Sequence, residues 1–462
     1  MSRKERDALG TMEIPDECYW GIQTERAVRN FPVTGRRERP GFIHSYALVK
    51  KAAARANMEL DELDSIRGTA IVQATDEIAA GIFDEQFPVD VFQAGAGTSC
   101  NMNLNEVIAN RALEILEHDK GEYDFLSPND HVNLGQSSND TFPTASHLAI
   151  VQAADGLDTI LRSISVSFQE KAKEFALIPK SGKTHLMDAV PITLGDEFNA
   201  YGTAINRCAD ILRDQRDLLL EVPMGGTATG TGVNAHPMFR TTVILELGKL
   251  TSLDLSPARD SFEALQSRSQ MSSFSGALRS LALELIRIAN DLRLLGSGPN
   301  AGLGEIRLPA VQPGSSIMPG KVNPVMAECL DMVAFQVVAH DTAVSLAAQA
   351  GQMELNVMTP VMTYNILESL AMLTSYLPAF EARCLRGITA DKERCLAGIE
   401  GNPMLATILA PRIGYLKAAE LAIESQRTGR PVKDLAIEKG IIDQSEADSI
   451  FDPLSLAKKV FR

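Results

Sequence analysis

A loop between two long apolar segments combines residue types that suit acid–base chemistry. The segment Gly314-Ser-Ser-Ile-Met-Pro-Gly-Lys-Val-Asn-Pro324 holds two adjacent hydroxyls, Ser315 and Ser316, the cation of Lys321 and the carboxamide of Asn323. Its glycines and prolines exclude regular structure, so we expect a loop that is able to move. A phosphate-binding loop is excluded, because valine follows Lys321 where a magnesium-binding hydroxyl would stand. An ordinary interhelical loop would carry more charge and fewer kinds of hydrogen-bonding group.

A second polar segment, Gly95-Ala-Gly-Thr-Ser-Cys-Asn-Met-Asn103, precedes a predicted helix over residues 102–116. A dinucleotide fingerprint is excluded, because Cys100 stands where the third glycine would be and no strand precedes the segment. Thr98 or Ser99 could cap the helix. A capped helix N-terminus with free N–H groups is also a suitable site for a carboxylate, so both interpretations are compatible.

A third segment places Ser137, Ser138 and Asn139 in a row before a helix that we expect to begin near Pro143. These residues are either a helix cap or hydrogen-bond donors for a carboxylate. The presence of the 314–324 loop in the same chain favours the second interpretation.

Two further loops are expected to interrupt the helical part of the chain. Residues 181–188 contain Thr184 and His185, and a lone histidine is more often structural than catalytic. Residues 225–232 are rich in glycine, but no strand precedes them and no lysine lies within them. We therefore predict a tight connection there rather than a phosphate site.

Long helices must position these segments. Three- and four-residue spacing of apolar residues predicts helices over about 143–176 and 263–295, and composition predicts another over 45–60. A helix over 325–350 is apolar nearly all round, with Glu328 among its few polar interruptions. Such a helix must be buried on every side, so we expect a helical bundle that continues into neighbouring subunits.

Composition limits the possible partners. A net charge of −15 argues against nucleic acid, but local cations can still bind a small anion. No apolar run of membrane-spanning length free of charge is seen, and the six scattered cysteines predict reduced thiols in a cytoplasmic protein. We expect a mainly α protein with three domains, over 1–139, 140–394 and 395–462, and neither a metal nor a cofactor.

Three of these segments carry a family resemblance. GAGTSCNMN at 95–103, KTHLMDA at 183–189 and GSSIMPGKVNP at 314–324 resemble the signatures of the fumarase/aspartase superfamily. That resemblance implies a homotetramer in which long helices form a shared bundle and each active site takes segments from three subunits. It also implies cleavage of a C–N or C–O bond of a succinyl unit, with release of fumarate.

The resemblance also implies a role for each candidate residue. Ser315 matches the general base, a demanding role for a hydroxyl unless nearby donors and cations stabilise its alkoxide. His185 matches a residue near the departing group, and Glu328 matches the carboxylate that orients it. The residues that match substrate-binding positions are Thr98, Ser137, Ser138 and Ser316 for the aci-carboxylate, Lys321, Asn323 and Thr184 for the other carboxylate, and Asn139 for the departing group.

The branch of the superfamily depends on a few positions. GAGTSCNMN, AGQMELNVMTPV at 350–361 and Ser127, where fumarases usually carry histidine, favour the aspartase branch and L-aspartate as substrate. Ser138, where aspartases usually carry threonine, and Asn234-Ala-His-Pro237 are typical of fumarases. Lys183 stands where most relatives have arginine. Fumarate hydratase, a lyase for a modified or N-substituted aspartate, and a non-catalytic structural member stay open as alternatives, although the complete set of candidate residues argues against the last.

Overall fold

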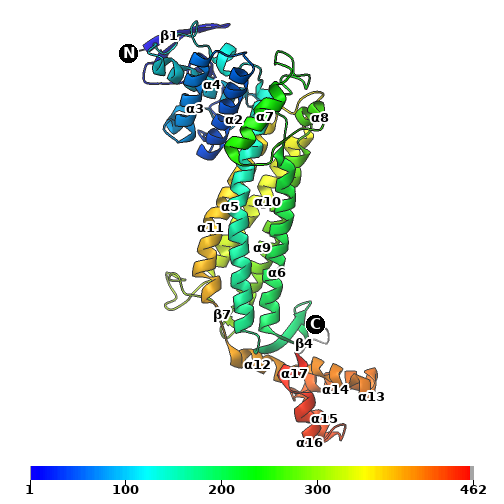
Figure 1. Ribbon diagram of the computed structural model, residues 1–462. Coiled ribbons are helices and arrows are strands. Elements are labelled where there is room, and N and C mark those ends of the chain that lie inside the picture. The colour runs from blue at the N-terminus through cyan, green and yellow to red at the C-terminus, as the bar shows by residue number, and fades with distance from the viewer. Residues whose placement is uncertain (1, 458–462) are drawn as a thin grey trace. The chain divides into compact units, whose positions relative to one another are not determined.

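Five long helices dominate the computed structural model, which describes residues 2–457 (Figure 1). They are α5 (Ser138–Glu174), α6 (Leu194–Asp217), α9 (Ser269–Leu295), α10 (Val325–Gln349) and α11 (Thr359–Arg383). Strands in the described part of the chain form four small sheets of two strands each. The predicted mainly α class is confirmed.

The chain divides into two compact units, and each is made from separate stretches of sequence. The first comprises Met1–Asp158, Asp210–Ser280 and Gln336–Met372; the second comprises Thr159–Ala209, Leu281–Phe335 and Leu373–Arg462. All five long helices contribute a stretch to each unit. The predicted division into three domains along the sequence stays a prediction.

Polar contacts on buried faces fix the register of α5 against α11. In the first unit the hydroxyls of Ser146 and Thr363 lie 2.8 Å apart. In the second unit Ser167 Oγ donates to Glu381 Oε1 at 2.6 Å. Because a buried polar group is costly without its partner, these contacts disfavour a helix that slides by one turn.

Helix α10 packs its acidic residues against α9. Asp341 pairs with Arg279 at 2.8 Å in the first unit, and Asp331 pairs with Arg293 at 2.9 Å in the second. Among the described residues, α10 is the one helix that by length and composition could cross a membrane, and 39% of its most apolar stretch is buried.

The prediction that α10 is buried on every side, within a bundle that continues into neighbouring subunits, stays a prediction, because part of the helix is exposed in the single chain. Met332, Phe335 and Leu346 are 66%, 55% and 59% exposed. Burial of this helix would therefore require further chains.

The N-terminal part of the first unit combines a hairpin with short helices. Asp64 caps α3 by accepting from the N–H groups of Ile66 and Arg67. The elements are β1 (Ser2–Asp7), β2 (Gly10–Pro15), α1 (Ile22–Asn30), α2 (Pro40–Glu59), α3 (Ser65–Ala79), α4 (Thr98–Ile115), a π-helical turn (Pro128–Val132), β5 (Glu221–Val222), α7 (Phe239–Thr251), β6 (Ser256–Pro257) and α8 (Ser261–Gln266).

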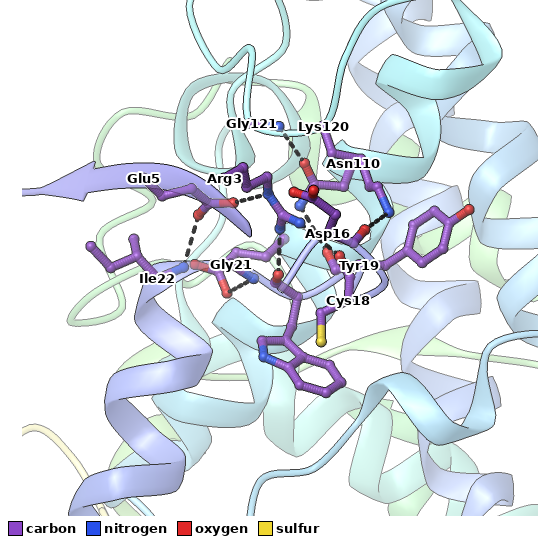
Figure 2. A network of polar contacts seen from close by, with 12 residues as sticks. Arg3, Glu5, Asp16, Cys18, Tyr19, Gly21, Ile22, Asn110, Lys120 and Gly121 are labelled. Carbon is purple, nitrogen blue, oxygen red and sulfur yellow. Dashed lines mark hydrogen bonds and ion pairs between the residues drawn. The ribbon is translucent and has the colours of Figure 1, made fainter. Parts of the chain in front are cut away.

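Two buried glutamates from other elements cap α1, which has no side-chain cap of its own. Glu5 of β1 accepts from the N–H of Ile22 at 2.8 Å, next to its ion pair with Arg3 (Figure 2). Glu106 of α4 accepts from the N–H groups of Gly21, at 2.9 Å, and Gln23, at 2.8 Å. The N–H groups at the start of α1, which have no partner within the helix, are thereby hydrogen-bonded.

The second unit contains a hairpin and the C-terminal helices. Strands β3 (Pro179–Thr184) and β4 (Met187–Thr193) pair antiparallel. This hairpin includes residues 181–188, where the sequence predicts a loop. The buried side chains of Leu409, Leu421 and Leu435 form a core among the C-terminal helices. The remaining elements are β7 (Ile306–Arg307), β8 (Thr389–Ala390), α12 (Lys392–Glu400), α13 (Ala410–Ile413), α14 (Tyr415–Thr428), α15 (Val432–Glu438), α16 (Gln444–Ile450) and α17 (Pro453–Leu456).

Candidate active site

The N-terminus of α4 presents Thr98 as the first residue of that helix, so Thr98 does not cap it. The cap is Gly97, whose φ of +71° lies in the left-handed region that favours glycine. A Cβ at Gly97 would overlap the ring of Phe142 in α5. Glycine therefore lets the two helix starts approach, and Thr98 Oγ1 lies 3.0 Å from Ser138 Oγ.

The N-terminus of α5 is closed by a reciprocal pair of hydrogen bonds. Ser137 Oγ accepts from the N–H of Asn139 at 3.2 Å, and Asp140 Oδ1 accepts from the N–H of Ser137 at 3.0 Å. This is a capping box with aspartate in the acidic position. The helix begins at Ser138, five residues before the predicted start at Pro143, which lies inside it.

Asp140 also joins the start of α5 to the glycine-rich segment 225–232. Its Oδ2 accepts from the N–H groups of Gly225, at 3.0 Å, and Thr227, at 2.9 Å. Asn139 Nδ2 donates to the carbonyl of Ala228 at 2.8 Å. Burial raises the pKa of Asp140 to about 6, against the opposing effect of its N–H partners. Asp140 is not among the predicted site residues, although the Ser-x-x-Asp spacing at 137–140 indicates its place at the helix start.

A buried lysine contacts the residues that precede the start of α5. Lys50 of α2 is fully buried and donates to Asn133 Oδ1 and Gln136 Oε1, both at 3.0 Å. Burial lowers its pKa to about 7. Tyr46, one turn earlier in α2, contacts Thr141 Oγ1 at 2.8 Å. These contacts hold the residues before and after Ser137 in place.

In the second unit, the turn of the β3–β4 hairpin carries the candidate histidine. Thr184 is paired with Met187, which leaves His185 and Leu186 as a two-residue turn. Both have positive φ, at +57° and +60°, as a type I′ turn requires. Neither is glycine or asparagine, so the turn holds backbone strain, a feature often found at functional sites. Thr184 and His185 are exposed in the single chain.

The 314–324 segment is a loop, as predicted, and it is closed by its own hydrogen bonds. The N–H of Gly314 donates to the carbonyl of Lys321 at 2.8 Å, and Asn323 Nδ2 donates to the carbonyl of Gly314 at 2.6 Å. Asn323 thus uses one amide hydrogen to shape the loop. Its role in holding a carboxylate stays a prediction.

Within the loop, two backbone N–H groups point at Ser315. Its Oγ accepts from Ile317 at 3.2 Å and from Met318 at 3.0 Å. Donors directed at a hydroxyl oxygen stabilise its ionised form, as a serine base requires. Ser316 and Lys321 are exposed on the same loop.

The candidate residues thus fall into three groups within one chain. Thr98 and Ser137–Asn139 lie in the first unit; the hairpin turn and the 314–324 loop lie in the second. Among the hydrogen bonds of residues 2–457, none joins His185 to Glu328, which lies in the first turn of α10. The predicted histidine–glutamate pair therefore stays a prediction. The described residues hold no cluster of three or more His, Cys, Asp or Glu arranged for a metal ion.

Comparison with known proteins gives the family. The model of a family described as "Lyase" matches residues 10–339, and one described as "Fumarase C C-terminus" matches residues 405–458. An aspartate ammonia-lyase from a Bacillus species is 46% identical over 454 residues, which is 98% of this chain and 97% of that protein. A class II fumarate hydratase from Thermosynechococcus vestitus is 46% identical over 448 residues, 97% of this chain and 96% of that protein.

A solved structure shows the same fold. The cobalt-bound crystal structure of a Brucella melitensis protein, described as fumarate lyase:delta crystallin, matches with a TM-score of 0.96 and 47% identity, covering 99% of this chain and all of that one. These matches extend over nearly the whole chain, as the three signature segments predicted. The chain therefore belongs to the fumarase/aspartase superfamily of lyases.

Proposed function

We propose that this lyase is an aspartate ammonia-lyase, which converts L-aspartate reversibly to fumarate and ammonia. The observation that carries the proposal is the pair of backbone N–H groups, from Ile317 and Met318, that donate to Ser315 Oγ. They provide the stabilisation that a serine alkoxide needs in order to act as a general base.

The reaction begins with a proton transfer. The Ser315 alkoxide removes a proton from the carbon beside one carboxylate, and the electron pair moves into that carboxylate to form an aci-carboxylate. Thr98 and Ser138, whose hydroxyls lie 3.0 Å apart, supply donors for its oxygens together with Ser137 and Ser316. The electron pair then forms the carbon–carbon double bond as the C–N bond breaks on the opposite face. Ammonia leaves with the C–N bonding pair.

The rest of the substrate is held by cationic and polar groups. Lys321, Asn323 and Thr184 hold the second carboxylate, and Asn139 and His185 lie by the departing amine. Nδ2 of Asn139 donates to the carbonyl of Ala228, so Oδ1 is the side-chain atom that can accept a hydrogen bond from the substrate. An ammonium group carries only donors, so an acceptor suits it.

The choice of aspartate rests on residues that differ between branches. Ser127 Oγ accepts from the N–H groups of Asn129, at 3.2 Å, and Asp130, at 3.1 Å, and so caps the π-helical turn. This position is where fumarases usually carry a histidine. The identities to an aspartate ammonia-lyase and to a class II fumarate hydratase are equal at 46%, so identity does not decide between them.

A second candidate, fumarate hydratase, is favoured by Ser138, which has the fumarase form. The methyl group that a threonine would add is missing beside Thr98, which also suits a larger, N-substituted aspartate.

We further propose a cytoplasmic homotetramer in which each site takes residues from several subunits. The exposed apolar residues of α10 support it, because further chains would bury them. Light scattering is expected to give four times the chain mass, and a stable, active monomer would contradict the shared site.

Fumarate absorbs in the ultraviolet, so one assay tests the substrate. Purified protein is mixed with L-aspartate and, separately, with L-malate. We expect fumarate from aspartate. Fumarate from malate alone would favour the hydratase, and a folded tetramer that uses neither would favour a modified substrate or a structural role.

A further inference from the structure

Two lysines of β3 reach the same carboxylate although they are three residues apart. Lys180 Nζ lies 2.6 Å from Glu305 Oε2, and Lys183 Nζ lies 2.6 Å from Glu305 Oε1. Side chains alternate between the two faces of a regular strand, so residues three apart point to opposite faces. A regular β3 would direct only one of these lysines towards Glu305.

An irregularity in the hairpin lies between the two lysines. The pairing shifts from Ser181–Pro191 to Lys183–Asp188, so one extra residue lies in β4, where Ala189 and Val190 stand opposite Gly182. Such a bulge disrupts the ladder locally and increases the twist of the paired strands. A Cβ at Gly182 would lie 2.6 Å from the carbonyl oxygen of Val190. The bulge therefore needs glycine opposite it, and it sets the pairing of Thr184 with Met187.

Charge and burial make the contact with Glu305 strong. The side chains of Lys180 and Glu305 are 1% and 7% exposed. Glu197 provides a second carboxylate for Lys180, at 2.8 Å, but does not contact Lys183. Burial lowers the pKa of Lys180, but Glu197 and Glu305 together raise it above its usual value, so this lysine is charged at neutral pH.

Glu305 is itself held firmly by its backbone. Its N–H donates to the carbonyl of Leu295 at the end of α9, and its carbonyl accepts from the N–H of Asp391, both at 2.9 Å. It directly precedes β7, in the segment that leads to the 314–324 loop. A two-stranded hairpin is marginally stable alone, so the register of β3–β4 depends on such fixed points.

We propose that Glu305 is a positioning residue, which holds Lys180 and Lys183 on either side of the β3 residues that face the bulge and so fixes the register that presents Thr184 and His185. The inference rests on the proposed function, which gives Thr184 and His185 their roles at the substrate. Pairing with Glu305 also gives a role to Lys183, which stands where most relatives have arginine. Lys183 donates a hydrogen bond to Oε1 of Glu305, and Lys180 forms an ion pair with Oε2.

Hydrogen exchange of the full-length protein tests the register directly. We expect backbone amides of residues 184–188 to exchange at least tenfold faster in Glu305→Gln than in the wild type. Glu197→Gln removes a carboxylate from Lys180 but leaves Lys183 paired, and is expected to stay within twofold of the wild type. Unchanged exchange in Glu305→Gln, or equal acceleration in Glu197→Gln, would overturn the proposal.

A milder pair of variants covers the case in which Glu305→Gln does not fold. Lys183→Met keeps the Lys180–Glu305 ion pair, and we expect the same acceleration at 184–188. Lys183→Arg keeps the contact with Glu305 and is expected to restore wild-type exchange. Fast exchange in Lys183→Arg, or wild-type exchange in Lys183→Met, would contradict the role of the ion pair.

Kinetics provide a second readout with the substrate that the wild type turns over. We expect Lys183→Met to lower kcat at least tenfold and Lys183→Arg to restore it, while Glu197→Gln keeps the wild-type value. Wild-type kcat in Lys183→Met would overturn the positioning role. A wild type that turns over no substrate would contradict the proposed function alone, because the exchange result does not depend on turnover.

Discussion

The hydroxyl oxygens of Thr98 and Ser138 lie 3.0 Å apart, although the two residues begin different helices and are 40 positions apart in the sequence. Each helix start adds free N–H groups and the positive end of its dipole. We propose that these two hydroxyls and the two helix N-termini bind the carboxylate that gains charge. This is the part of the proposed site that the first unit supplies.

Removal of the Ser138 hydroxyl is expected to weaken transition-state binding. Ser138→Ala loses one donor to a charged oxygen, worth about 1.5–3 kcal/mol. That corresponds to a decrease in kcat/KM of about ten- to hundredfold, measured by fumarate release. Ser146→Ala is the matched control, because Ser146 is a buried serine of the same helix that bonds Thr363 instead. Equal kcat/KM for Ser138→Ala and the wild type would remove Ser138 from the site.

The close approach of α4 and α5 depends on Gly97. Gly97→Ala forces a Cβ into Phe142 and places alanine at positive φ, so we expect a loss of about 2–4 kcal/mol in the free energy of unfolding. Gly156→Ala is the control. Nothing lies within 4 Å of its added Cβ, and alanine favours the helix by about 1 kcal/mol. Thermal unfolding compares the two, and equal midpoints would show that the approach is not tight.

Glu106 is expected to make stability depend on pH. Burial raises its pKa to about 7, despite bonds from Thr24 and Gln23. Because the folded pKa lies above the unfolded value, the protonated form is favoured in the fold. The stability that this contributes is complete below pH 4.5 and is lost as the pH rises to 7. The lost stability is about 3 kcal/mol, at 1.36 kcal/mol per unit of pKa.

Denaturant unfolding of the wild type and of Glu106→Gln, which has no such titration, measures this effect. The wild type should lose stability relative to the variant between pH 4.5 and 7. A difference between the two proteins that is constant with pH would show that Glu106 is not perturbed.

Several parts of this fold could be predicted from local sequence alone. Apolar spacing and composition predicted helices that match α2, α9 and α10 closely, since 3.6-residue periodicity is a local signal. The glycines and prolines of the 314–324 loop also predicted its lack of regular structure. The region predicted as one helix over 263–295 breaks between α8 and α9, where buried Arg268 bonds Thr359 of α11. That partner lies far away in the sequence, so the break has no local signal.

The hairpin at 179–193 shows what local reasoning cannot provide. Its strands lack a clear alternation, because a bulge in β4 opposite Gly182 shifts the pairing. Glu305, far away in the sequence, pairs with the β3 lysines on both sides of Gly182. Proline favours the first turn of a helix, so the sequence predicts that α5 begins near Pro143, whereas the cap formed by residues 137–140 begins the helix earlier. Which candidate residues meet across subunits is a question of assembly, which no single stretch of sequence encodes.

Ser315 should be indispensable for turnover. Ser315→Ala removes the general base, and we expect kcat to fall by at least about a thousandfold, within the range for acid–base groups. Ser316→Ala on the same loop keeps the base and should retain far more activity. Fumarate release measures both, with light scattering to confirm an intact assembly. A Ser315→Ala variant within tenfold of the wild type would assign the base to another residue.

The most direct test of the account measures both products from one substrate. Ammonia and fumarate are quantified together as the purified wild type consumes L-aspartate, with L-malate in a parallel reaction. If the protein is an aspartate ammonia-lyase, we expect equal amounts of ammonia and fumarate from aspartate, and a kcat/KM for aspartate well above that for malate. Fumarate from malate, with no ammonia or fumarate from aspartate, would contradict it.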